Sequence, residues 1–138
     1  MVTRLSALFA AGCLGGLATV LTLWLFGILG ISGALGVGLA PPLTPPMIYS
    51  FMIWGGIWGF AFLLPLGSLN MFARGLLLSL GPTIVQLLVV FPMKMGVGVL
   101  GLDLGTLTPL LVLIFNGVWG LVAAWWLTRQ EAGVLVAA

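Results

Sequence analysis

The chain has 138 residues, of which 62% are apolar and 4% are charged, and none is histidine. A soluble domain carries about 25% charged residues, so this composition indicates a membrane protein. The absence of histidine removes the usual ligand of haem, zinc and copper and the usual acid–base group near neutral pH. Only two carboxylates are present, which excludes paired-carboxylate catalysis within one chain. We expect neither an enzyme nor a haem or metal protein.

Four long uncharged runs predict four membrane-spanning helices, at about 5–30, 47–66, 75–93 and 108–127. A bilayer core of about 30 Å requires roughly 20 helical residues, and each run comes close to that length. Alternating ten-residue segments, typical of a membrane β-barrel, do not occur. The predicted fold class is therefore an all-α polytopic membrane protein, with one transmembrane domain over 1–138.

The basic residues predict how the chain is oriented. Four spans put Arg4, Arg74 and Arg129 on one side of the membrane, and Lys94 alone on the other. By the positive-inside rule, this bias places both termini in the cytoplasm. We expect an integral protein of the bacterial inner membrane, or of a thylakoid membrane.

A repeated pattern indicates two duplicated helical hairpins, 5–66 and 75–127. The residues GLAPPLTP begin at Gly38 and are followed by GGIWG, and GLDLGTLTP begins at Gly101 and is followed by NGVWG. The shared frame is GL…LTP…(G/N)G(I/V)WG, with a difference of three residues in its spacing. Thr44 and Thr108, each before a proline, are expected to cap the helices that follow. Parallel halves would be related by an axis along the membrane normal.

Small residues at four-residue spacing predict close helix contacts. The candidate packing faces contain Gly12, Gly16, Gly55, Gly59 and Gly120. Such faces serve either the packing of one four-helix bundle or contacts with another chain, and the sequence leaves both open.

The third span carries a polar stripe. Ser79, Thr83 and Gln86 fall on one helix face, and Asn116 of the fourth span is the expected hydrogen-bond partner of Gln86. Pro82 is expected to kink this helix. The stripe is interpreted either as interhelical hydrogen bonding or as a polar track for a solute.

The two links opposite the termini are unusually apolar for segments in water. We expect lipid, the other link or another protein to cover them. Lys94 and Asp103 bracket the second link and form a candidate ion pair, unless Lys94 extends on its own to the interface.

The stretches APPLTPPMIYSFMIWGGIWG and LTPLLVLIFNGVWG resemble uncharacterised small four-span bacterial inner-membrane proteins. The resemblance implies the fold and brings no site residues. We expect a non-catalytic accessory subunit of a larger membrane complex, whose partners are lipid and other integral subunits or copies of the chain. The small net charge of +2 does not favour nucleic acid. Apolar clefts would suit bound lipid or pigment, and the alternative function is a small oligomeric channel or transporter.

Overall fold

The structure is a computed structural model, which describes residues 2–137 and the side chains of residues 2–133. It is all-α, and residues 2–137 contain no strand. The elements are α1 (Val2–Ile28), α2 (Ile31–Ala34), α3 (Pro45–Gly59), η1 (Phe60–Leu63), α4 (Met71–Leu78), α5 (Leu80–Val85), η2 (Gln86–Met95), η3 (Val99–Leu104) and α6 (Thr108–Ala137).

Four helices are long and apolar enough to cross a membrane. They span Val2–Ile28, Pro45–Leu63, Met71–Met95 and Thr108–Gly133. This confirms the predicted class of an all-α four-span membrane protein. The third helix begins earlier than the sequence suggested, because the side chain of Asn70 caps it by accepting a 2.8 Å hydrogen bond from the Ala73 N–H. The fourth continues beyond 127, since a charged residue ends an apolar run without ending a helix.

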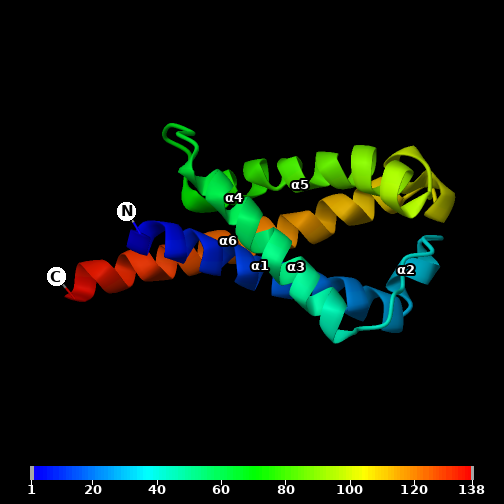
Figure 1. Cartoon of the computed structure of the whole chain (residues 1–138), viewed down its shortest axis with the longest axis horizontal. Coiled ribbons are helices and arrows are strands. Elements are labelled where there is room, and N and C mark those ends of the chain that lie inside the picture. The colour runs from blue at the N-terminus through cyan, green and yellow to red at the C-terminus, as the bar shows by residue number, and fades with distance from the viewer. Residues whose placement is uncertain (1, 138) are drawn as a thin grey trace.

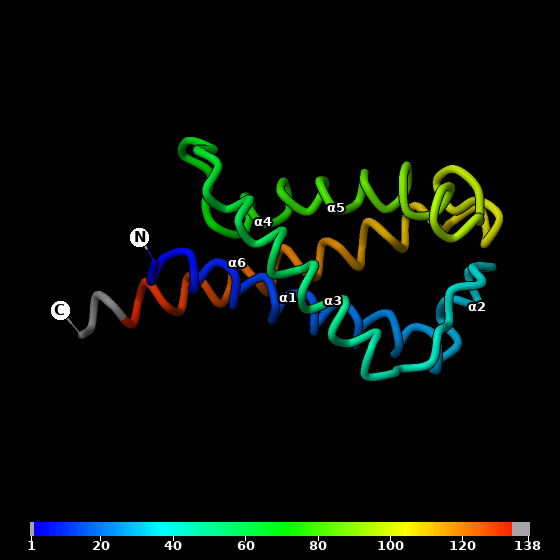
Figure 2. The backbone as a smooth tube through the Cα atoms, in the orientation of Figure 1, coloured from blue at the N-terminus to red at the C-terminus, as the bar shows by residue number. Residues whose placement is uncertain are grey.

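Most helix contacts join α3 to α1, α1 to α6, and α4 to α6, and α3 runs diagonally across α1 in the view of Figure 1. α1 and α6 run antiparallel through the middle, α3 packs against α1, and α4 and α5 pack against α6. Both termini lie at one end, together with the turn between η1 and α4, and we call this the termini end (Figure 2). The links 29–44 and 96–107 lie at the other end, called the link end. The central pair of α1 and α6 is therefore contacted by both of the other membrane helices.

The third membrane helix is irregular along its length. α4 gives way to α5 at Ser79, three residues before Pro82, and this break is the expected effect of a proline without an N–H. Beyond Val85 the helix widens into the π-helical turns of η2, which contain Pro92. It ends at Gly96 in a left-handed conformation, with φ 65°.

The two links cover each other at the link end. The Gly38 N–H donates a 2.8 Å hydrogen bond to the Leu104 carbonyl, and Val37 is buried among side chains of α1 and α6. Leu100 and Gly101 both have positive φ, which folds η3 back so that Gly101 lies against the Phe91 ring. Leu100 is a strained position, because a leucine side chain disfavours that conformation. We expected lipid, the other link or another protein to cover each link. Within this chain, it is the other link that does so.

The threonine caps predicted at two helix starts were wrong. Thr44 precedes α3 in an extended conformation, but its side chain makes no capping hydrogen bond. The Thr108 hydroxyl is buried and has no hydrogen-bond partner. After Thr44, Pro46 removes the N–H of the second helical residue, which is one of the two from which a capping side chain can accept a hydrogen bond, so less is gained from a cap there.

Candidate functional site

The polar residues of the third and fourth helices lie together, on the side of the third helix that faces α6. Ser79, Thr83 and Asn116 are buried, and Gln86 is half-buried. The Asn116 Nδ2 donates to the Gln86 Oε1 at 3.4 Å, which is long for a hydrogen bond. The partners are those expected from the sequence, and the contact between them is weak.

The hydroxyl groups of this face bond within their own helix. The Ser79 hydroxyl donates to the Leu76 carbonyl at 2.6 Å, and the Thr83 hydroxyl donates to the Ser79 carbonyl at 2.7 Å. Such bonds to preceding carbonyls are typical of serine and threonine in helices and accompany bends. Neither hydroxyl proton is therefore free for a solute or a neighbouring helix.

The predicted packing glycines lie at two helix crossings. At the first, Gly12 and Gly16 of α1 meet α3, and a Cβ on either would collide with a backbone carbonyl of α3. Gly55 and Gly59 occupy the same crossing from the α3 side. These four glycines serve packing inside the chain, one of the two uses that the sequence left open.

The second crossing joins α4 to α6 through Gly75 and Gly120. A Cβ on either glycine would overlap the carbonyl of the other. Sequence reasoning found Gly120 and missed Gly75. The signal was present, because Gly75 and Ser79 form a small-xxx-small pair along the face that carries the polar stripe.

Each half of the chain places one tryptophan against a glycine of the other half. Trp119 of α6 lies on Gly15 of α1, and its indole N–H donates to the Gly55 carbonyl at 3.2 Å. Trp58 of α3 lies on Gly81 of α5. Both tryptophans belong to the repeated (G/N)G(I/V)WG segment. These contacts join the two hairpins near the middle of the membrane helices.

The structure does not bring Lys94 and Asp103 together as an ion pair. The Asp103 carboxyl group lies against Gly98, and its backbone N–H donates to the Val97 carbonyl at 3.1 Å. The positive φ of Gly98 and Gly101 folds this segment tightly. Asp103 is therefore placed by the backbone of its own link.

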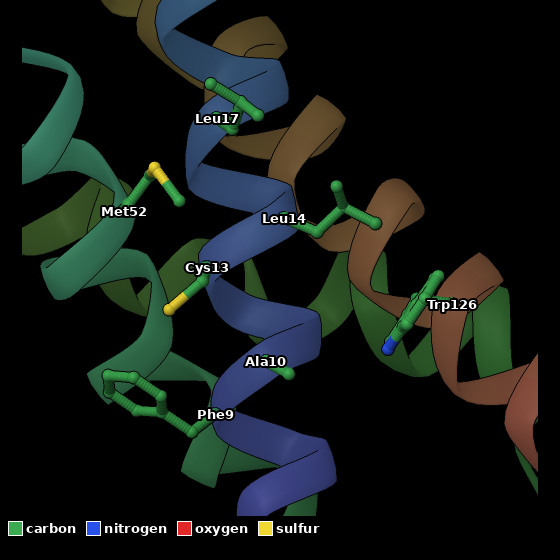
Figure 3. Close-up of a pocket in the computed structure, with 7 residues that line it drawn as sticks. All are labelled: Phe9, Ala10, Cys13, Leu14, Leu17, Met52 and Trp126. Atoms are coloured by element: carbon green, nitrogen blue, oxygen red, sulfur yellow. The ribbon is translucent and has the colours of Figure 1, made fainter.

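A cavity of about 440 Å³ runs along the outward side of α1 between α3 and α6 (Figure 3). Its lining is Phe9, Ala10, Cys13, Leu14, Leu17, Met52 and Trp126. The Trp126 indole N–H is buried and has no hydrogen-bond partner. Apart from that group and the Cys13 thiol, the lining offers only apolar contact. Such a groove suits an apolar molecule such as a lipid chain.

A second cavity, of about 710 Å³, opens at the termini end and is lined partly by arginines. No group of three metal-ligating side chains occurs among the described residues. Comparison of the chain with protein-family models, curated proteins and solved structures found no match. The function must therefore be argued from the geometry of this chain.

Proposed function

We propose that the chain is a non-catalytic accessory subunit of a larger integral membrane assembly. The main support for this proposal is the position and exposure of Trp54, which lies at the midpoint of the second membrane helix, Pro45–Leu63. Its side chain is 59% exposed, and the structure gives its indole N–H no hydrogen-bond partner among residues 2–133. Tryptophan exposed to lipid normally sits at the membrane interfaces, where its N–H reaches water or headgroups. At mid-membrane, a neighbouring protein supplies the missing acceptor.

The distribution of buried surface supports the same proposal. In the most apolar window of each membrane helix, 44% and 50% of the residues are buried in the first and fourth helices, but only 22% in the second and third. On the second helix, Ile53 and Ile57 flank Trp54 and are also exposed. The face of α3 that carries these three residues, called here the Trp54 face, is the proposed contact with another integral subunit or a second copy of the chain.

Substitution of Trp54 tests the proposal. A tagged chain extracted from its native membrane in mild detergent should elute in a larger complex, and Trp54→Leu should weaken that complex about tenfold or more, as buried interfacial tryptophans do. Trp54→Phe, which keeps an aromatic ring but removes the N–H and the five-membered ring of the indole, should lie between Trp54→Leu and the unchanged chain. The matched control is Trp125→Phe, because Trp125 is also exposed but lies on α6, outside the proposed contact surface of α3. Elution of the unchanged chain as a monomer alone would contradict the proposal.

We also infer the location and orientation. Three arginines at the termini end against one lysine at the link end support cytoplasmic termini. A bacterial inner membrane, or a thylakoid membrane, is the proposed location. Lipid surrounds the exposed apolar side chains, and the groove along α1 is the proposed place for a bound lipid chain or pigment.

Duplication of one helical hairpin is part of this proposal. The reciprocal contacts support it, since Trp58 reaches the second hairpin and Trp119 the first. The crossings also correspond, because Gly59 and Gly120 occupy the same place in the repeated segment and each meets the preceding helix of its own hairpin.

The alternative proposal is a small oligomeric channel or transporter. It rests on the amide groups of Gln86 and Asn116, which are the polar groups of the stripe not bonded to their own helix. The self-bonded hydroxyls of Ser79 and Thr83 favour the accessory role, because a polar track needs groups that are free to exchange partners with a solute.

A further inference from the structure

The cavity at the termini end combines two arginines with an apolar wall. Its lining is Thr3, Arg4, Ala7, Leu8, Phe62, Met71, Arg74, Leu127, Gln130 and Glu131. The residues come from all four membrane helices, so the cavity is formed only when the bundle is assembled. It does not overlap the Trp54 face, and the inference drawn from it does not depend on the proposed subunit role.

The polar lining lies at the depth of lipid headgroups. Arg4 is in the first turn of the first membrane helix, and Arg74 is in the first turn of the third. Gln130 and Glu131 are in the last turn of the fourth, Thr108–Gly133. Helix ends of membrane spans coincide with the boundary between hydrocarbon and headgroups. The cavity therefore faces lipid phosphate groups along its polar rim and acyl chains along its apolar wall.

Arg74 is held in place and still lacks an anion. Its Nη2 donates to the Phe62 carbonyl at 2.9 Å and to the Leu64 carbonyl at 3.1 Å. These bonds tie the guanidinium to the end of η1 and fix its plane. The Nε is buried and has no hydrogen-bond partner, which leaves a partly desolvated cation without a counter-charge. A phosphate group in the cavity would balance that charge, since arginine forms strong charge-assisted hydrogen bonds with phosphate through its remaining N–H groups.

We propose that this cavity binds the phosphate group of an anionic phospholipid between Arg4 and Arg74. The acyl chain lies along Leu8, Phe62 and Leu127. Thr3 and Gln130 supply further hydrogen-bond donors at the rim. Glu131 contributes one negative charge against the positive charges of the two arginines, so the cavity keeps a net positive charge. It therefore selects a headgroup with a single negative charge over a neutral one.

Native mass spectrometry of the purified full chain tests the proposal. The chain in a maltoside detergent is titrated with phosphatidylglycerol, and in parallel with phosphatidylcholine. One phosphatidylglycerol should bind in preference to phosphatidylcholine. Arg4→Gln should weaken that binding about fivefold, the usual effect of one basic residue at an anionic membrane surface. Arg4 is exposed on α1, so this change leaves the fold intact.

Two further variants and one ligand serve as controls. Arg129 lies next to Gln130 but stacks on Trp125 instead of lining the cavity, so Arg129→Gln should leave binding unchanged. Glu131→Gln removes the opposing charge and should tighten binding. Equal losses in Arg4→Gln and Arg129→Gln would overturn the proposal in favour of diffuse charge attraction. Displacement of the lipid by millimolar inorganic phosphate would overturn it in favour of a soluble anion.

Discussion

Both hairpins bring their two helices into close contact through glycines, but the first helix of one is regular and that of the other is irregular. α1 is a single regular helix whose crossing with α3 is lined by glycine on both sides. Its counterpart is divided into α4, α5 and η2, and its crossing with α6 combines Gly75 and Gly120 with Ser79. α1 contains no proline and stays regular, although Thr19 and Thr22 bond to carbonyls of their own helix. Its counterpart contains Pro82 and Pro92, which lack the N–H that a helix needs and leave carbonyls to be satisfied in another way.

The comparison shows where variation is tolerated in this fold. The glycine contacts fix how closely the helices approach, and both hairpins keep them. The course of the helix beyond the crossing is free to differ. The π-helical turns and the folded-back link are found in the second hairpin past the Gly75–Gly120 contact, and the polar stripe starts at that contact with Ser79.

The largest expected effect comes from widening a crossing. Gly12→Ala and Gly120→Ala each place a Cβ where a carbonyl of the facing helix lies, so each should lower the free energy of unfolding by about 2–3 kcal/mol. The measurement is denaturant unfolding in detergent micelles, followed by tryptophan fluorescence. Gly33→Ala is the control, because nothing lies within 4 Å of its Cβ. A small cost for Gly120→Ala alone would show that the bent hairpin adapts where the straight one cannot.

Substitutions of Trp58 and Trp119 should have effects of intermediate size on the free energy of unfolding, and the two effects should differ. Trp119 is 3% exposed and donates to the Gly55 carbonyl, whereas Trp58 is half-buried and its indole makes no such bond in the structure. Trp119→Phe should therefore cost about 1 kcal/mol more than Trp58→Phe in the same unfolding experiment. Equal costs would indicate that the two contacts are equivalent, as an undistorted duplication would have them.

The smallest effect is expected at the polar stripe. Gln86→Leu removes a hydrogen bond that is already 3.4 Å long, so the free energy of unfolding should change by only about 0.5 kcal/mol. The same variant in proteoliposomes should leave solute flux unchanged, and Asn116→Leu provides the matching change on α6. A loss of flux without a loss of stability would favour the channel alternative.

Much of the fold follows from local patterns in the sequence. Uncharged length predicts four helices, Pro82 predicts the break in the third, and the spacing of Gly55 and Gly59 predicts a close contact. These features depend on neighbours a few residues away, which a sequence shows directly. The contact between Gln86 and Asn116 could be predicted because these two residues carry the only amide side chains within the four predicted spans.

Other features depend on which helices become neighbours. Lipid chains are as apolar as leucine, so hydropathy does not tell which faces of four apolar helices meet. The pairing of Gly75 with Gly120 and the reach of Trp119 to Gly55 follow only from that arrangement. The arginine-lined cavity was missed for the same reason, since its residues come from four membrane helices that are far apart in the sequence.

The self-bonded hydroxyls of the third helix bear on the order in which the protein is made. The third helix packs mainly against α6, which follows it in the chain and is therefore synthesised after it. Between its own insertion and that of α6, the side of the third helix that will face α6 is exposed to the bilayer. The hydroxyl groups of Ser79 and Thr83 bond to carbonyls of their own helix, so they need no partner from α6 before it inserts. The third helix can therefore remain stable in the hydrocarbon until α6 packs against it.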